Sequence, residues 1–320
     1  MPSPTVSVVI PTYNRPEHLR TCLEHLAGQV PPADAIVVVD ASTGSESRAV
    51  VEAAEGVHYL RNDLGAGHTA GSRQIGVAAT TTDVIAFVDD DAYASPGWLA
   101  ALLVPYGDPA VSAVGGRAAN GEPGEELEGA DQVGRFLPDG TLTGFFAADP
   151  GHDVDVDHLL GANMSVRRAA LDEVGGIRDI YPGTCLREET DAVLRMRMRG
   201  DRVVYTPAAE VRHVAGPYAK GRRFDLRYSY YAQRNHLVLL GATVGIRDTH
   251  FRRYLLVSLR AAGGEIAYAA RAFGRLRTRE GSVVRGVANG LLRSVSTFAG
   301  MLVGLGRAMT LPAAARGTTR

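Results

Sequence analysis

Three consecutive aspartates, Asp89, Asp90 and Asp91, directly follow the apolar run VIAFV at residues 84–88. Carboxylates this close together repel one another, so the cluster destabilises a fold unless a cation or hydrogen bonds compensate it. Because side chains alternate along an extended segment, Asp89 and Asp91 should point to one side and Asp90 to the other. Two carboxylates on one side suit a hard divalent ion, Mn²⁺ or Mg²⁺, that also binds a diphosphate. A solvated acidic loop is the alternative that so short a motif leaves open.

A second group of acids, Glu188, Glu189 and Asp191, opens a helix that we predict over residues 188–199. Counting 100° per residue, Glu189 shares a face with the apolar residues of this helix, whereas Glu188 lies well round from it. Asp191 is spaced to pair with Arg195 at i, i+4. The helix dipole alone also favours acids at a helix N-terminus, so a purely structural role is left open.

The elements that must position these acids alternate between strand and helix. We predict strands at 6–11, 31–40, 57–61 and 84–89, and helices at 15–29, 45–55, 68–79 and 96–103. Continuous apolar strands alternating with helices indicate a parallel sheet covered on both faces. Ligands bind such sheets beyond the carboxyl ends of the strands, where Asp40 closes one strand and the aspartates close another. The predicted fold class is α/β, with a doubly wound, mostly parallel sheet.

The regular pattern is interrupted in the middle of the chain. Between about 117 and 157, the stretches NGEPGEELEG and PDGTLTG are rich in turn formers, which predicts a long loop or a hairpin insertion. Residues 158–176 then indicate a strand followed by a helix, and residues 203–214 one or two strands. After residue 224 the pattern is mostly helical.

Charge is distributed unevenly along the 320 residues, whose net charge is −1. From Arg247 to Arg320 there are thirteen arginines against three acids, so this tail carries +10 and the remainder −11. An acidic body with a basic tail predicts a partner for the tail, such as an anionic membrane surface. Packing on the catalytic domain and a homo-oligomer interface are the alternatives left open. We expect no nucleic-acid partner.

Neither end of the chain nor its cysteines indicate export. The longest uncharged stretch of the tail, Ser294–Gly306, has 13 residues, against the ~20 needed to cross a bilayer. The N-terminus lacks the basic region of a signal peptide. Cys22 and Cys185 lack metal-ligand spacing and favour a reducing compartment. These features predict a cytoplasmic protein, with peripheral attachment at the inner face of the cell membrane as one role for the tail.

Seven motifs occur in the order found in family 2 glycosyltransferases with the GT-A fold: SVVIPTYNRP, VVVD, NDLGAGHTAGSRQIG, FVDDDA, GANMSVRR, GTCLREETD and VRHVAG. The chain resembles this family over about residues 5–216. YYAQRN at 230–235 resembles the rhamnosyl- and galactofuranosyltransferase-like members. The resemblance implies a GT-A catalytic domain over 1–223, with a nucleotide-binding half (1–116) and an acceptor-binding half (117–223). A mostly helical extension over 224–320 would follow.

The resemblance also implies an activity and a donor site. The enzyme would transfer a sugar from a nucleoside diphosphate sugar, UDP- or dTDP-linked, to a hydroxyl of a glycolipid, polysaccharide or small molecule. Tyr13 and Asp40 would hold the base, Arg73 would lie near the nucleotide, and Asp90 would lie by the ribose or sugar. Further substrate-binding positions are Pro11, Arg15, Gly161, Asn163 and Arg234, the last with packing as its alternative.

The resemblance assigns the metal and the general base in the same way. Asp89 and Asp91 would bind Mn²⁺ or Mg²⁺, and His213 would complete the shell. Inverting relatives use one carboxylate of an acidic pair at a helix start as the base that deprotonates the acceptor. Here the pair is Glu188 and Glu189, with Asp191 nearby, and the family's usual Asp at the second position is Glu189. We predict Glu189 as the base, displaced by one methylene from the usual position.

Three other functions compete with this interpretation. A sugar-phosphate nucleotidyltransferase should carry a Gly-rich, Arg-containing loop after the first strand, which PTYNRP does not match. A dinucleotide-dependent oxidoreductase needs G-x-G-x-x-G, and GAGHTAG has the wrong spacing. A binding or scaffold protein that kept the fold without catalysis is favoured only by the exchange at Glu189. The intact aspartate triplet and His213 argue against it.

Overall fold

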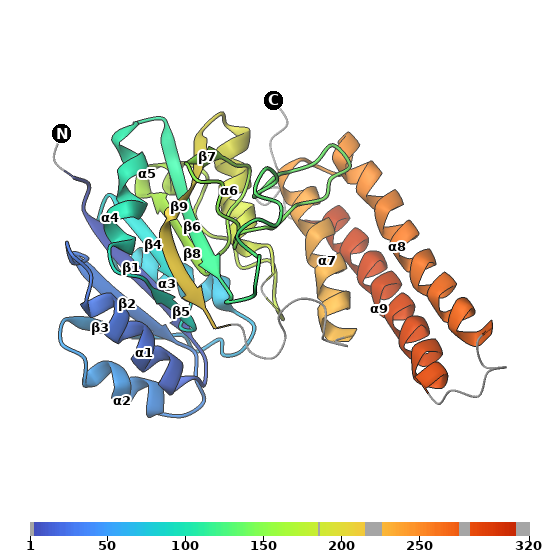
Figure 1. Ribbon diagram of the computed structural model, residues 1–320, viewed down its shortest axis with the longest axis horizontal. Coiled ribbons are helices and arrows are strands. Elements are labelled where there is room, and N and C mark those ends of the chain that lie inside the picture. The colour runs from blue at the N-terminus through green and yellow to red at the C-terminus, as the bar shows by residue number, and fades with distance from the viewer. Residues whose placement is uncertain (1–2, 185, 215–225, 275–281, 312–320) are drawn as a thin grey trace. The chain divides into compact units, whose positions relative to one another are not determined.

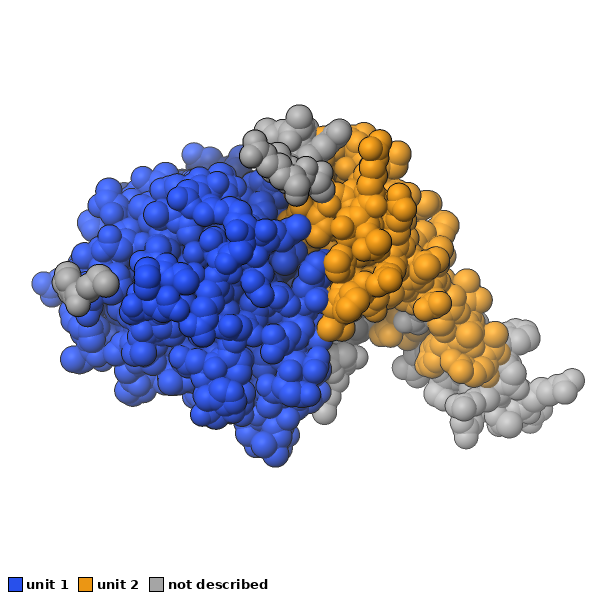
Figure 2. Space-filling model, turned by 90° about the horizontal axis from the view of Figure 1, so that it is seen from above, with its two compact units in different colours: residues 1–136, 142–216 blue, residues 137–141, 217–320 orange. Residues whose placement is uncertain are grey.

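The computed structural model describes residues 3–184, 186–214, 226–274 and 282–311. The chain divides into two compact units: unit 1 is Met1–Phe136 with Leu142–Gly216, and unit 2 is Leu137–Thr141 with Pro217–Arg320 (Figure 2). The predicted boundary at residue 223 lies outside the described residues, and residues 137–141 belong to unit 2. Cys22 is buried in unit 1, and Cys185 lies outside the described residues.

Within the described residues, a nine-stranded sheet forms the centre of unit 1 (Figure 1). Its order is β3-β2-β1-β4-β8-β6-β9-β5, and β7 pairs with β9. The strands are β1 (Val6–Thr12), β2 (Ala35–Asp40), β3 (Val57–Arg61), β4 (Val84–Val88), β5 (Ala92–Ala94), β6 (Val111–Ala119), β7 (Val154–Asp155), β8 (Asn163–Arg167) and β9 (Arg202–His213).

Most strands of this sheet share one direction, as predicted. β1 pairs in parallel with β2 and β4, β2 with β3, and β6 with β9. Because β8 runs antiparallel between β4 and β6, the strands β6 and β9 point the same way as β4. β5 and β7 run antiparallel to β9. The carboxyl ends of β1, β2 and β4 therefore meet at one edge of the sheet, where the functional residues should gather.

Two hydrophobic cores cover the two faces of the sheet, because alternate residues of each strand point to opposite sides. Val8 and Ile10 of β1 pack in one core with α1 (Pro16–Ala27), α2 (Glu46–Glu52) and α4 (Trp98–Leu103). Val9 packs in the other core with α3 (Thr69–Ala78), α5 (Arg168–Glu173) and α6 (Glu188–Met198). A short 3₁₀ helix, Val104–Gly107, follows α4. All residues of β1 and β4 are buried, which explains their continuous apolar sequences.

The interrupted middle of the chain is a long loop, as predicted. Between β6 and β7 the described backbone consists of turns and one isolated antiparallel bridge, between Phe136 and Leu142. The segment predicted as one or two strands forms the single strand β9.

Unit 2 is helical in its described part, as predicted. It contains α7 (Leu226–Thr243), α8 (Thr249–Gly274) and α9 (Ser282–Thr310), and α9 packs against both α7 and α8 (Figure 1). Glycines allow the close approach of α9 to α7: a Cβ at Gly304 would lie 2.8 Å from the carbonyl oxygen of Arg234. Among the described helices, none combines the length and apolar character needed to cross a membrane.

Candidate active site

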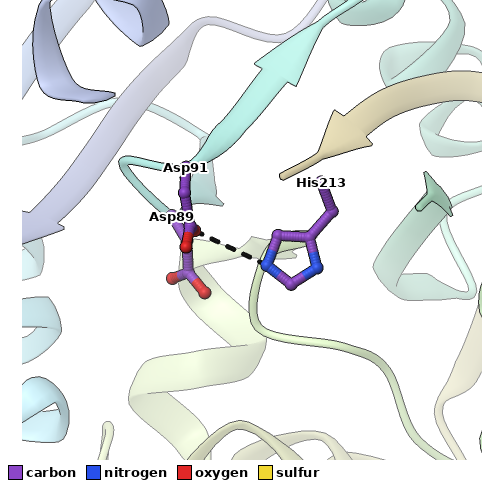
Figure 3. Close-up of side chains that lie close together, drawn as sticks. All are labelled: Asp89, Asp91 and His213. Atoms are coloured by element: carbon purple, nitrogen blue, oxygen red, sulfur yellow. Dashed lines mark ion pairs between the residues drawn. The ribbon is translucent and has the colours of Figure 1, made fainter. Parts of the chain in front are cut away.

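The strands β4, β5 and β9 bring the predicted metal ligands together at the edge of the sheet. Asp89 and Asp91 follow β4, and the register of β5 against β9 sets Ala92 opposite His213. The ligand atoms of Asp89, Asp91 and His213 all lie within 4.8 Å of one another, and His213 Nε2 is 3.5 Å from Asp91 Oδ1 (Figure 3). Asp89 and Asp91 thus converge as the alternation of side chains predicts.

The chemistry of this group fits a divalent cation. Carboxylate oxygens and an imidazole nitrogen are ligands of Mn²⁺ and, for the oxygens, of Mg²⁺. Burial opposes ionisation of Asp91, but the contact with His213 and the charge of Arg15 outweigh it, so the pKa of Asp91 lies below its usual range. Burial lowers the pKa of His213, whereas Asp91 raises it, and the net shift is upward. A bound cation would therefore compete with a proton for His213.

Asp90 and Arg15 stand beside this group. Asp90 is fully buried and accepts a hydrogen bond of 2.7 Å from Thr12 Oγ1. Arg15 is 44% exposed and places one nitrogen 2.6 Å from Asp90 Oδ1 and another 2.5 Å from Asp91 Oδ2. Its guanidinium is thus a partly exposed counter-charge at the rim of the acidic cluster.

Arg73 connects the metal-ligand group to the helix that carries the predicted base. Its side chain is 3% exposed, and its guanidinium donates to Glu188 and, at 2.8 Å, to Asp89 Oδ1. The same guanidinium donates to the carbonyl oxygen of Gly161 at 3.0 Å. A Cβ at Gly161 would lie 2.6 Å from Arg73, so glycine is needed there. Arg73 is therefore a buried brace that contacts the metal-ligand group through Asp89, and its place near the nucleotide stays a prediction.

The two glutamates of α6 differ in their surroundings. The expectation that Glu188 lies away from the packed side is wrong, because it is 2% exposed and paired with Arg73. The reason is that α6 is buried on nearly all sides of its first turns. Glu189 is half-buried and, among the described residues, forms no ion pair. Burial raises the pKa of Glu189, against the charge of Arg73, which suits a group that must accept a proton near neutral pH.

Asp191 is enclosed by partners. It is fully buried, accepts from Arg178 Nε at 2.9 Å, from Arg195 Nη2 at 2.9 Å and from Tyr181 Oη at 3.1 Å. The predicted pair with Arg195 is confirmed. Arg178 and Tyr181 lie before α6 in sequence, so Asp191 ties the preceding segment to the helix.

A cavity of about 120 Å³ opens beside Asp89. It lies between the end of β1, with Pro11 and Tyr13, and the glycine-rich segment 65–69 that leads into α3. Tyr13 is 38% exposed, so its ring is available for stacking. Thr69, the first residue of α3, also lines this space, and a helix N-terminus favours anions.

Three predicted substrate-binding residues have other partners. Asp40 is fully buried and accepts from the Ser42 backbone N–H at 2.8 Å and from Tyr59 Oη at 3.1 Å. Asn163 is also fully buried: it accepts from Trp98 Nε1 at 2.9 Å and donates to two backbone carbonyls, so it cross-links the sheet. Arg234 lies in unit 2, buried in α7 with its guanidinium 4.4 Å from the ring centre of Tyr231.

Sequence reasoning missed a contact between the glycine-rich segment and the segment before α6. His68 Nδ1 lies 2.7 Å from Asp179 Oδ2, and the Gly183 N–H donates to the carbonyl of Gly67 at 3.1 Å. A Cβ at Gly67 would lie 2.9 Å from the carbonyl oxygen of Gly183, so the two segments come as close together as only glycines allow. The partners are more than 100 residues apart, and no local pattern signals such a contact.

Comparisons with known proteins agree with this geometry. The model of the family "Glycosyl transferase family 2" matches residues 7–175. A pre-mycofactocin glycosyltransferase of Mycobacterium tuberculosis is 31% identical over 213 residues, which are 65% of this chain and 42% of that protein. A glucosyl-dolichyl phosphate glucuronosyltransferase of Haloferax volcanii is 30% identical over 220 residues, 65% of this chain and 68% of that protein. The chain thus spans less than half the length of the mycobacterial relative.

The fold is that of solved GT-A glycosyltransferases. A mannosyltransferase from Pyrobaculum calidifontis, solved in complex with GDP-Man and Mn²⁺, superposes with a TM-score of 0.59 at 17% identity. The superposition covers 96% of this chain and 86% of that one.

Proposed function

This chain belongs to glycosyltransferase family 2, and we propose that it is a metal-dependent, inverting transferase of a sugar from a nucleoside diphosphate to a hydroxyl acceptor. The observation that carries the proposal is the convergence of Asp89, Asp91 and His213 beside a cavity lined by Tyr13 and the start of α3. The Mn²⁺ and GDP-Man bound by the Pyrobaculum mannosyltransferase support the same ligand classes here.

The donor site would be built from residues already in place. Tyr13 stacks on the base, and Arg15 moves from Asp91 to the diphosphate, whose charge is the stronger attraction. Asp89, Asp91 and His213 would hold Mn²⁺ or Mg²⁺, which would supply positive charge for the departing nucleoside diphosphate. We propose a UDP- or dTDP-sugar as the donor.

The transfer step would use Glu189 as the general base. The acceptor oxygen attacks the anomeric carbon, the bond from that carbon to the diphosphate oxygen breaks, and the hydroxyl proton passes to a Glu189 oxygen. The nucleoside diphosphate leaves with the bonding electron pair. Arg73 holds Glu188 and Asp89 together, so the start of α6 keeps a fixed place relative to the metal ligands.

The finer predictions follow from the same premise. The name of the Haloferax relative, which acts on a dolichyl phosphate carrying glucose, supports a glycolipid among the proposed acceptors. The rhamnosyl- or galactofuranosyltransferase subtype indicated by residues 230–235 stays a prediction, as does the role of Arg234 at the leaving group.

The experiment is a screen of UDP-, dTDP- and GDP-sugars for release of the nucleoside diphosphate with Mn²⁺ present. The parent should turn over at least one donor, and Glu189→Gln should lower turnover by about 10³-fold, the scale of a lost general base. Glu173→Gln, an exposed glutamate of α5, is the matched control. Donor binding by the parent without turnover would instead identify a non-catalytic binding protein.

A further inference from the structure

The outward side of α9 in unit 2 is apolar. In the described part of this helix, seven large apolar side chains are between 43% and 67% exposed: Leu291, Leu292, Val295, Phe298, Leu302, Val303 and Met309. On a wheel of 100° per residue they occupy one continuous sector, and the exposed Arg307 lies outside it. An exposed apolar sector of this width, without charged residues, is typical of a surface that contacts a partner.

The remaining sides of α9 are occupied within unit 2. A Cβ at Gly300 would lie 2.3 Å from the carbonyl oxygen of Tyr230, and one at Gly241 would lie 2.7 Å from the Cβ of Ala308, so α7 covers one side. Ser294 Oγ donates to the carbonyl of Ala262 at 3.1 Å, so α8 covers the next. The apolar sector is therefore the side that the other helices of this unit leave open.

The neighbouring helix α8 carries a matching pattern. Three exposed apolar side chains, Leu256, Leu259 and Ile266, at 55%, 48% and 53% exposure, form a row on the wheel that also contains the exposed Arg252. The exposed Tyr268 lies outside this row. Beside this row, Arg253, Arg260 and Arg271 form a basic row, all exposed and within about 20° of one another on the wheel. Apolar and basic rows side by side are the pattern of a helix that lies in a membrane interface.

The two apolar rows face the same way. Measured from the contact between Ser294 and Ala262, the apolar row is displaced by about 70° on α8 and by about 110° on α9, in the same rotational sense. Because α9 runs back along α8, displacements in the same sense place both rows on one side of the pair (Figure 1). We call this side the apolar face of unit 2: the exposed rows of α8 and α9 together.

The charge of α8 and α9 indicates which kind of partner binds this face. The sequences of α8 and α9 contain seven arginines and one acid, Glu265. A second copy of the chain would bring arginines against arginines, whereas anionic headgroups would neutralise them. No described helix can cross a bilayer, so attachment would be parallel to the surface. We propose that the apolar face of unit 2 docks on an anionic lipid surface, with Leu302 and Phe298 inserted and Arg253, Arg260 and Arg271 at the headgroups.

The test is co-sedimentation of the full chain with vesicles of phosphatidylcholine alone and of phosphatidylcholine with 30% phosphatidylglycerol, at low and high salt. The parent should bind the anionic vesicles at low salt and at least tenfold less the neutral ones. The pair Phe298→Ser and Leu302→Ser should reduce binding at least tenfold, and the pair Arg260→Gln and Arg271→Gln should reduce it several-fold. The pair Val104→Ser and Leu127→Ser, apolar positions of unit 1 that are even more exposed, should bind like the parent.

Three results would overturn the proposal. The first is a parent that does not sediment with anionic vesicles at low salt. The second is binding that is equal on neutral vesicles and unaffected by salt. The third is a parent dimer, seen by analytical ultracentrifugation without vesicle binding, that the Phe298 and Leu302 exchanges dissociate, since this would assign the face to a second copy. All substituted side chains are exposed, and circular dichroism verifies that the variants are folded.

Discussion

The negative charges of two groups of carboxylates in unit 1 are balanced by different kinds of partner. Asp191 is fully buried, and Arg178, Arg195 and Tyr181 surround it with donors of the protein itself. Asp89 and Asp91 lie at the sheet edge, where Asp91 depends on the exposed Arg15 and on His213. An acid enclosed by fixed donors stabilises the fold, whereas acids balanced by groups that can move leave room for a ligand. Both groups look alike in sequence, and the difference lies in their counter-charges.

The largest effect should come from breaking the enclosed group. Asp191→Asn leaves the charges of Arg178 and Arg195 buried without a full partner, so the free energy of unfolding should fall by about 3–5 kcal/mol. Urea denaturation measures this. Asp172→Asn, an exposed aspartate of the neighbouring helix α5, should change it by less than about 0.5 kcal/mol. Equal stability of the two variants would refute the enclosed role of Asp191.

Shortening the proposed base tests Glu189, which lies in the same helix turn as Asp191 but forms no ion pair among the described residues. Glu189→Asp withdraws the carboxylate by one methylene, and a displacement near 1 Å should lower turnover by roughly 10²-fold. The KM for the donor should stay the same, because Glu189 is not a donor ligand in this mechanism. Steady-state kinetics separate the two parameters, and an unchanged turnover would remove Glu189 from the transfer step.

Neutralising one acid of the cation site should weaken metal binding strongly and stability only modestly. Asp91→Asn should weaken Mn²⁺ binding by about tenfold or more, since a neutral amide is a poorer ligand for a hard cation. Without metal, the free energy of unfolding should fall by about 1 kcal/mol, because Asp91 loses its ion pairs with the partly exposed Arg15 and His213, which hold its pKa below the usual range. Calorimetric titration and urea denaturation give the two values. A loss of stability as large as that of Asp191→Asn would instead assign Asp91 a structural role like that of Asp191.

The last prediction concerns the pH dependence of stability through His158, a buried histidine that forms no ion pair among the described residues, in contrast to His213. Burial lowers the pKa of His158 to about 4, with a hydrogen bond of 2.8 Å to the Thr143 carbonyl opposing it. The unfolded chain therefore binds this proton more readily, so stability is full above about pH 6.5 and is lost as pH falls toward 4. The slope should reach about 1.4 kcal/mol per pH unit. His158→Gln should make the urea midpoint depend less on pH between pH 6.5 and 4.5. The same pH dependence in the variant and the parent would contradict this assignment.

Much of the fold could be predicted from the sequence, because its signals are local. Apolar runs separated by turns predicted the strands and helices of unit 1. The alternation of side chains after β4 correctly predicted that Asp89 and Asp91 lie close together. His213, 122 residues from Asp91, was placed only through the resemblance of ordered motifs. The burial of Glu188 was not predictable from α6 alone, because Arg73 of α3 covers it. The cross-links through Asn163 and the contact of Gly67 with Gly183 likewise depend on distant segments.

The account depends most on a divalent cation that joins Asp89, Asp91 and His213 to the donor's diphosphate. Isothermal titration of UDP, GDP and dTDP in Mn²⁺ and again in EDTA tests this in the parent and in Asp91→Asn. We predict that Mn²⁺ raises the affinity of the parent for at least one nucleotide by tenfold or more, and that the variant loses this gain. Nucleotide affinity in the parent that is the same with Mn²⁺ and with EDTA would contradict the account.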